Sequence, residues 1–195
     1  MELSLNPGKA STIRSVGQNR RMAGAFQVRR AVAADAEGIS AVMHAVVAER
    51  VHSAIDRAWP ADEERRYLES LSNREAFHVA VADSGQIVAC QSLERYSTVL
   101  TTMSHVAQVG TFVLPSWRGR GAGVSLFEAT RRFAVSEGYR KVVITVRGSN
   151  APALSFYRSL GFLECGRLSR QVVLDGVEDD EVLLEMFLDR QNRQV

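Results

Sequence analysis

The segment best suited to chemistry is "RGRGAG", residues 118–123, which follows the apolar run 109–115 and leads into a helical pattern from Ala122. A glycine-rich turn that feeds a helix exposes unpaired backbone N–H groups at the positive end of the helix dipole. Glycines at 119, 121 and 123 leave room for phosphate oxygens to reach these amides. Arg118 and Arg120 add charged donors. The segment therefore predicts a site for a phosphorylated ligand.

Two common phosphate loops do not fit. The segment lacks the Lys-Ser/Thr pair of the Walker loop, and it lies late in the chain, without the early βαβ unit of a dinucleotide fold. It resembles the Q/R-x-x-G-x-G/A signature of the GNAT superfamily of acetyl-CoA-dependent N-acetyltransferases, matched by Arg118, Gly121 and Gly123. The resemblance covers roughly residues 26–188 and is strongest over 105–165, where "KVVITV" and "NAPALSFYRSLGF" follow in the family's order. A glycine turn with incidental arginines is the alternative.

The resemblance implies a set of cofactor-binding residues. The loop amides would hold the pyrophosphate of coenzyme A, and Phe112 and Val113 would hydrogen-bond the pantetheine arm along the preceding strand. The loop comprises Arg118, Gly119, Arg120, Gly121, Ala122 and Gly123. Asn150 resembles the family's cofactor-contacting asparagine at the start of the next helix, and it could equally be a plain helix N-cap.

The implied reaction, acetyl transfer to an amine, needs a neutral amine and a proton for the leaving thiolate. An alkyl amine with a pKa of about 10.4 costs about 4.6 kcal/mol to deprotonate at neutral pH, whereas an α-amine near 8 costs about 1.4 kcal/mol. Tyr157 resembles the family's tyrosine near the leaving sulfur, where a phenol can act as general acid. Packing of its helical face against the core is the alternative role.

The general base is less well specified. Many relatives carry a carboxylate on the strand before the loop, where this chain has Gln108, which is no useful proton acceptor. Glu94 on the previous strand and His105, with its suitable intrinsic pKa, are the candidates. Surface pairing is the alternative role of each. Gln108 would orient acceptor or water, and a backbone amide between Gly110 and Val113 would hold the oxyanion.

Acceptor specificity should come from the early helices, the segment 49–60 and the loop near 170–180. Trp59, Arg57, Glu49 and His52 could line an acceptor pocket or could be ordinary surface and packing residues. The acidic "DGVEDDE" (175–181) is expected to be a solvated turn.

Composition limits the class of protein. A chain of 195 residues with 46% hydrophobic residues and a net charge of +2 is expected to form one domain that binds neither nucleic acid nor membrane. No secretory or membrane-spanning stretch is evident, so we expect a cytoplasmic protein. The two cysteines, Cys90 and Cys165, are expected to be buried thiols. The four histidines lack ligand spacing, so no metal site is expected.

Hydrophobic periodicity predicts the order of elements. Residues 1–24 form a basic tail that we expect to be disordered, with Met22 an alternative start, and residues 25–190 form the single acetyltransferase domain. Helices are expected over 33–51, 61–73, 122–137 and 151–160. Strands are expected over 77–83, 86–97, 104–115, 141–146, 162–174 and 180–188, with a bulge or close approach at Gly110 and a turn at Asp175-Gly176.

These observations together predict an α/β fold of the GNAT type. Its central sheet would be mixed and mostly antiparallel, with one splayed parallel strand pair and flanking helices. The function expected is transfer of an acetyl group from acetyl-CoA to a primary amine of a small molecule, directly in a ternary complex and without a metal. A protein N-terminal or lysine acetyltransferase is one alternative, and a non-catalytic acyl-CoA sensor is the other. A homodimer is possible, as in relatives.

Overall fold

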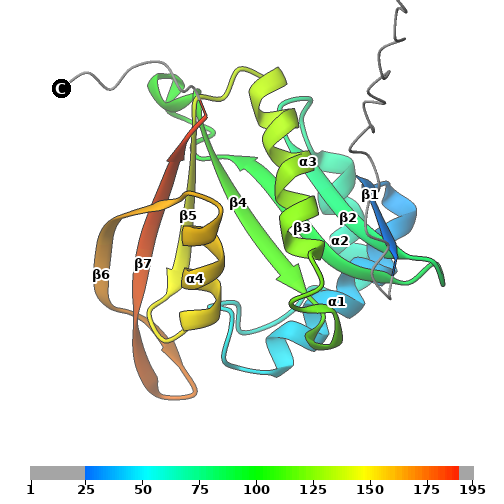
Figure 1. Cartoon of the computed structure of the whole chain (residues 1–195), viewed down its shortest axis with the longest axis horizontal. Coiled ribbons are helices and arrows are strands. Elements are labelled where there is room, and N and C mark those ends of the chain that lie inside the picture. Colours follow the sequence, from blue (N-terminus) through cyan, green and yellow to red (C-terminus); the bar gives the residue numbers. More distant parts are fainter. Residues whose placement is uncertain (1–24, 189–195) are drawn as a thin grey trace, which may run out of the picture.

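The computed structural model describes residues 25–188, so the prediction for the tail lies outside the described residues. Figure 1 shows a central sheet with helices on both sides. The strands are β1 (Phe26–Arg30), β2 (Ala76–Ala82), β3 (Ile87–Arg95), β4 (Val106–Val113), β5 (Lys141–Arg147), β6 (Leu163–Leu174) and β7 (Val177–Phe187). The helices are α1 (Ala36–Ala48), α2 (Ala61–Ser70), α3 (Ala122–Ser136) and α4 (Ala151–Ser159).

The strand order is β1-β2-β3-β4-β5-β7-β6, and every neighbouring pair is antiparallel except β4 and β5. This parallel pair is short: it runs from Val106–Lys141 to Gln108–Val143 and then stops. Beyond that point β4 stays paired with β3, and β5 stays paired with β7, while the two strands separate from each other (Figure 1). The predicted fold class, with its splayed parallel pair, is confirmed.

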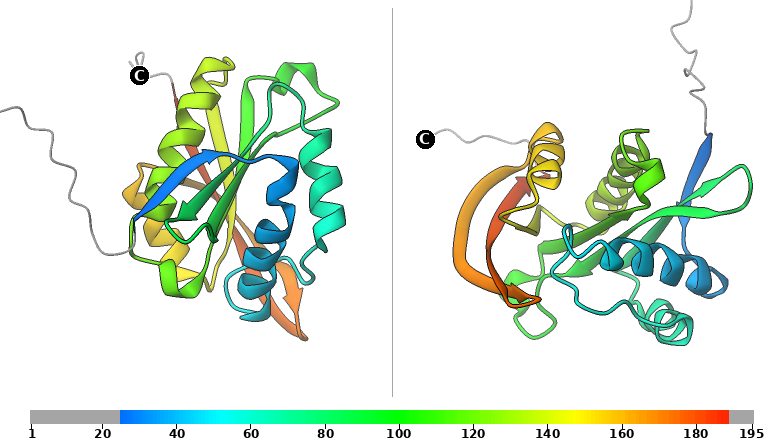
Figure 2. Two further views of the ribbon diagram at one scale, coloured as in Figure 1. Left: turned by 90° about the vertical axis from the view of Figure 1, so that its right-hand side faces the viewer. Right: turned by 90° about the horizontal axis from the view of Figure 1, so that it is seen from below.

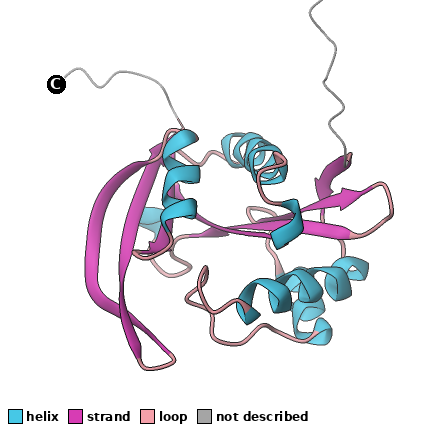
Figure 3. Ribbon diagram, turned by 60° about the horizontal axis from the view of Figure 1, so that its bottom comes forward, coloured by secondary structure: helices cyan, strands magenta, loops and turns pink. Residues whose placement is uncertain are grey.

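The helices form one layer on each face of the sheet (Figures 2 and 3). α1 and α2 pack through a cluster that contains Ile39, Val79 and Cys90, and α3 and α4 pack through a second cluster that contains Phe127 and Tyr157. Because successive side chains of a strand point to opposite faces, Gln108, Gly110 and Phe112 of β4 belong to the α1/α2 face. The intervening Val109 and Thr111 belong to the α3/α4 face.

The acidic segment 175–181 is not a solvated turn. Only Asp175 and Gly176 form the turn, with φ of 53° and 78°, as a two-residue hairpin of this kind requires. The following residues belong to β7, where Asp179 accepts hydrogen bonds from Arg147 Nε (2.9 Å) and from Ser149. Arg147 also donates to the carbonyl of Arg50 (3.1 Å), which ties the segment after α1 to the sheet. Sequence alone missed this because Arg147 lies on a different strand from the acidic run.

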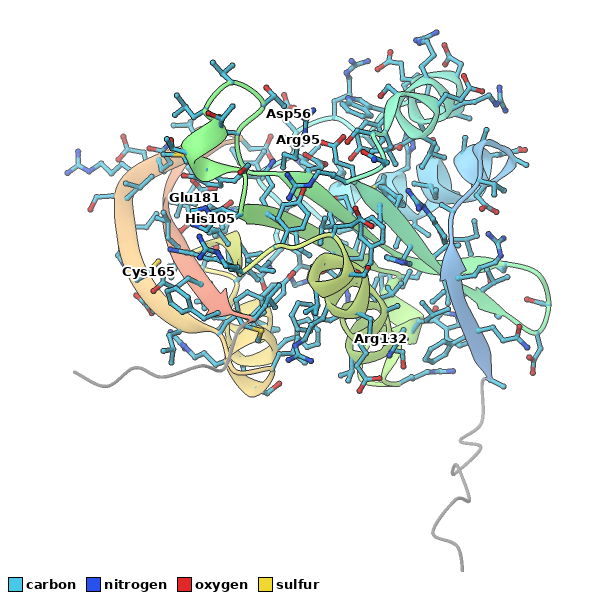
Figure 4. All side chains as sticks on the ribbon, turned by 90° about the horizontal axis from the view of Figure 1, so that it is seen from above. Asp56, Arg95, His105, Arg132, Cys165 and Glu181 are labelled. Atoms are coloured by element: carbon cyan, nitrogen blue, oxygen red, sulfur yellow. The ribbon has the colours of Figure 1, made fainter. Side chains whose placement is uncertain are left out.

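The cysteine prediction is half correct. Both thiols are free, and Cys90 is buried. Cys165 is exposed on β6, the edge strand that Figure 4 shows at the rim of the molecule. An apolar pattern in an edge strand does not guarantee burial, because a covering layer must also be present.

Asp179→Ala is expected to lower the free energy of unfolding by about 3–5 kcal/mol, because it leaves the guanidinium of Arg147, 8% exposed, without its carboxylate. Urea unfolding at neutral pH measures the effect. Glu178→Ala, at an exposed neighbouring position, should change stability by less than about 0.5 kcal/mol. Equal losses in the two variants would contradict a stabilising role for the Arg147–Asp179 pair.

Candidate functional site

The glycine loop has the geometry of an anion cradle. Gly119 and Gly121 adopt φ of 71° and 87°, which residues with side chains rarely adopt, and beyond the adjacent residues no atom lies within 4 Å of where their Cβ atoms would be. Gly121 is the N-cap of α3, so the N–H groups of the first helical turn, including that of the buried Ala122, have no acceptor within the helix. The loop can therefore present several amides to a phosphate group.

The third glycine of the loop, Gly123, is needed for helix packing. A Cβ on Gly123 would lie 3.0 Å from Cζ of Phe156, so this glycine lets α3 pack closely against α4. Gly123 also lines the cleft described below, so its predicted role in admitting phosphate oxygens stays a prediction beside this packing role.

The two arginines of the loop are engaged with the protein. Arg118 forms a bidentate ion pair with Glu49, just after α1, and its Nε donates to the carbonyl of Val113 (3.2 Å). This contact lowers the pKa of Glu49. The guanidinium of Arg120 stacks over the ring of Trp117, 5.2 Å from its centroid. Arg118 lines the cleft described next, whereas Arg120 does not.

A cleft of about 810 Å³ extends from this loop along β4 to Tyr157 and Thr145, a volume typical of small-molecule sites. We call it the donor cleft. Asn150 lines it and caps α4: its Oδ1 accepts from the N–H of Ala153 (3.1 Å), and its Nδ2 donates to the carbonyl of His52 (2.9 Å). The N-cap role is confirmed, and contact with a cofactor stays a prediction.

Phe112 and Val113 line the donor cleft next to the unpaired edge of β4. The side chain of Phe112 packs against the cluster of Ile39 and Val79, and that of Val113 packs against a cluster that contains Leu126. These residues can therefore bind a ligand through their backbone N–H and C=O groups. The bulge predicted at Gly110 is wrong, because β3 and β4 pair in unbroken register. The close approach is real: a Cβ on Gly110 would lie 3.2 Å from Oγ of Ser92.

Tyr157 is buried on α4, and its hydroxyl donates to Oγ1 of Thr111 (2.9 Å). Burial raises the pKa of this phenol to about 12, so it carries its proton at neutral pH. The side-chain amide of Gln91 donates to the same Thr111 oxygen (2.7 Å). A hydroxyl has two acceptor positions and one hydrogen, so the hydrogen of Thr111 is free to point elsewhere in the donor cleft. Thr111 and Gln91 were not predicted, because nothing in their local sequence links them to Tyr157.

A second cleft, of about 620 Å³, lies on the α1/α2 side, and we call it the acceptor cleft. Glu94 lines it with both oxygens engaged: Oε1 accepts from the hydroxyl of Tyr67 (2.6 Å) and Oε2 from the side chain of Gln108 (3.1 Å). The glutamine that replaces the family's carboxylate thus holds a carboxylate of the neighbouring strand. Tyr67 was missed by the sequence reasoning.

The residues predicted to bind the acceptor, and the second candidate base, lie in different parts of the site. Trp59 and Arg57 line the acceptor cleft, as expected, while His52 lines the donor cleft and Glu49 pairs with Arg118. His105 precedes β4, at the end farther from the glycine loop, and lines neither cleft (Figure 4). The structure therefore brings Glu94 to a cleft but not His105.

The two clefts meet where β4 and β5 separate. They share five lining residues, namely Ile55, Val109, Gly110, Phe112 and Thr145. A ligand that lies along β4 from the glycine loop would therefore reach the second cleft with its far end. Tyr157 and Thr111 approach this junction from one face of the sheet, and Glu94 approaches it from the other.

Comparisons with known proteins agree with this geometry. The profile described as "Acetyltransferase (GNAT) family" matches residues 43–162. The chain is 24% identical over 150 residues to the "Putative phosphinothricin acetyltransferase YwnH" of Bacillus subtilis, covering 77% of this chain and 91% of that protein. It is 33% identical over 122 residues to the "N-alpha-acetyltransferase" of Sulfurisphaera tokodaii, covering 56% and 70%. A solved structure titled "yncA, a putative acetyltransferase from Salmonella typhimurium with its cofactor Acetyl-CoA" has a TM-score of 0.79 at 19% identity, covering 88% and 98%.

The chain belongs to the GNAT family of acetyltransferases, because the family profile matches more than half of its length. It is an acetyl-CoA-dependent N-acetyltransferase. Among residues 25–188, no helix is long and apolar enough to cross a bilayer. Within the same residues, no three His, Cys, Asp or Glu side chains gather as they would around a metal ion.

Gly121→Val is expected to weaken acetyl-CoA binding at least about tenfold, because the side chain obstructs the amides and strains the backbone at φ of 87°. Isothermal titration calorimetry measures the affinity. Gly138→Val is the control, since Gly138 has a similar φ of 77° after the other end of α3 and lines neither cleft. Wild-type affinity in Gly121→Val would contradict the phosphate cradle.

Proposed function

We propose that this enzyme transfers the acetyl group of acetyl-CoA directly to a primary amine of a small molecule. The observation that supports this proposal is the junction of the two clefts at the separation of β4 and β5. The thioester carbon–sulfur bond breaks as the carbon–nitrogen bond forms, the sulfur gains a proton, and the amine loses one. We also propose that the enzyme is cytoplasmic and acts as a homodimer.

In the donor cleft, the amides from Arg118 to Gly123 would hold the pyrophosphate, and the open edge of β4 at Phe112 and Val113 would hold the pantetheine arm. Arg118 would exchange Glu49 for phosphate oxygens, since a guanidinium pairs bidentately with either anion. Arg120, stacked on Trp117, would add long-range positive charge. Asn150 would contact the cofactor while it keeps α4 capped.

Tyr157 would supply the proton for the leaving sulfur through Thr111. Thr111 donates its free hydrogen into the cleft and accepts the Tyr157 proton in return, a relay that the 2.9 Å contact allows. The high pKa of Tyr157 keeps the phenol protonated at neutral pH, so a proton is in place as negative charge develops on the leaving sulfur. Gln91 would fix the orientation of Thr111.

Glu94 would receive the proton of the amine on the opposite face. Tyr67 and Gln108 each occupy one lone pair of its carboxylate, so acceptor positions remain on both oxygens for an ammonium or a bridging water. A direct transfer also needs no nucleophile from the protein. Consistent with this, neither Cys90 nor Cys165 lines a cleft, and burial raises the pKa of Cys90.

A second candidate is acetylation of protein N-termini, which the similarity to an N-alpha-acetyltransferase favours. An α-amine would need less help from a base than an alkyl amine, by about 3 kcal/mol at neutral pH. The alternative of another class, an acyl-CoA sensor without activity, is opposed by the Tyr157–Thr111 contact and by the placement of Glu94.

The acceptor class is tested by following thiol release from acetyl-CoA across α-amino acids, diamines, polyamines, aminoglycosides and peptides with free N-termini or lysines. We expect release with small amines and little with peptides. Preference for peptide N-termini would favour the second candidate. Binding of acetyl-CoA without release for any acceptor would overturn the proposal in favour of a sensor.

Tyr157→Phe is expected to lower kcat about 100-fold or more, because the proton source is lost, while the dissociation constant of acetyl-CoA changes less than about twofold. Thr111→Val should cause a similar loss, and the double variant should lose little more, because the two residues act in one relay. Steady-state kinetics and calorimetry measure these quantities.

Tyr139→Phe provides the control, because Tyr139 is also buried and donates to a backbone carbonyl, that of Arg74 (3.0 Å), but lines neither cleft. It should retain kcat. Equal losses of turnover and of cofactor affinity in Tyr157→Phe would show that the tyrosine serves packing rather than proton transfer.

A further inference from the structure

Glu64 is an unpaired acid at the acceptor cleft. It lies in the first turn of α2, lines the cleft, and is only 4% exposed. Within residues 25–188 its carboxylate forms no hydrogen bond and no ion pair, in contrast to Glu94, whose two oxygens both have donors. The sequence reasoning missed Glu64, because a charged residue in the first turns of a helix is ordinarily exposed.

An ionised carboxylate that is buried without a partner destabilises the protein, and the pKa of Glu64 reflects this. Burial, together with the neighbouring charge of Glu63, raises the pKa of Glu64 to about 7, while His44 on α1 opposes the shift. On the sheet side, burial and the charge of Glu64 both raise the pKa of the Cys90 thiol, so this thiol is neutral and supplies no charge to Glu64. Within residues 25–188 no arginine or lysine forms an ion pair with Glu64, and the opposing effect of His44 is smaller than that of burial, so a cationic ligand would further stabilise the ionised form of Glu64.

The rest of the acceptor cleft also suits a cation. Its charged lining consists of Asp56, Glu64 and Glu94 against one arginine, Arg57, whose side chain is 71% exposed. Its walls are aromatic, a surface that attracts ammonium groups as well as methylene chains. These walls comprise Trp59, Tyr67, Phe77, Tyr96 and Phe112.

The two inward acids lie at different positions along this cleft. Glu94 is paired across the sheet with Gln108, where β4 and β5 stop pairing, so it lies near the junction. Glu64 lies on α2, three residues before Tyr67, whose hydroxyl reaches Glu94. Burial raises the pKa of Tyr67, and Glu94 and Glu64 both raise it further, so both carboxylates act on this side chain. An acceptor at the junction would therefore extend past Tyr67 toward Glu64.

We propose, on the basis of the proposed function, that the acceptor is a dication of the alkyl diamine or polyamine class. Its reacting amine lies at Glu94, its methylene chain lies along the aromatic walls, and its second ammonium binds Glu64. An amino-acid anion is disfavoured, because its carboxylate would face three acids and a single exposed guanidinium.

The test compares kcat/KM for 1,4-diaminobutane, 1-aminobutane and an α-amino acid at pH 8, in the wild type and in Glu64→Gln. We expect the wild type to prefer the diamine over the monoamine at least about tenfold. Glu64→Gln should lower kcat/KM for the diamine about tenfold through KM, and should change the value for the monoamine less than about twofold. Calorimetric titration of the CoA-bound proteins with the diamine should show the same loss of affinity.

Glu69→Gln is the matched control. This substitution removes one negative charge from the exposed side of the same helix, and Glu69 lines neither cleft. It should behave as the wild type. Equal kcat/KM for monoamine and diamine in the wild type, or an equal loss for both amines in Glu64→Gln, would overturn the role of Glu64 while the proposed function stands. No acetylation of any amine would instead overturn the proposed function itself.

Discussion

The site depends on the short parallel pairing of β4 and β5, which ends at Gln108 and Val143. Each strand keeps its other neighbour beyond this point, so both remain ordered while two backbone edges become unpaired and face each other. Unpaired edges inside a protein are costly unless a ligand or water satisfies them. The separation therefore both opens the donor cleft and provides the backbone groups that a pantetheine arm could bind.

The alternation of side chains along β4 divides the chemistry between the two faces of the sheet. Thr111 points toward α4 and meets Tyr157, whereas Gln108 points toward α2 and holds Glu94. Proton delivery to sulfur and proton removal from the amine are thereby kept on opposite sides of one strand. Two proton-transfer groups with well separated environments can keep different protonation states at the same pH.

Polar contacts hold the segment after α1 over the junction. Arg147 donates to the carbonyl of Arg50, and Asn150 donates to that of His52, so the wall shared by the two clefts is fixed to β5 and α4. Glu49 pairs with Arg118 of the glycine loop from the same segment. Binding of a phosphate group at Arg118 would thus act on the wall that also borders the acceptor cleft.

The sequence by itself determined the local parts of this protein: the glycine loop, the cap at Asn150, the position of Tyr157 and the order of elements. These features are encoded in contiguous residues, through positive φ, helix capping and hydrophobic period. Only the tertiary structure decided that Thr111 links Tyr157 to Gln91, and that Glu64 is buried at a cleft. Such contacts join distant segments, and burial depends on what packs above a residue, so neither leaves a local signal in the chain.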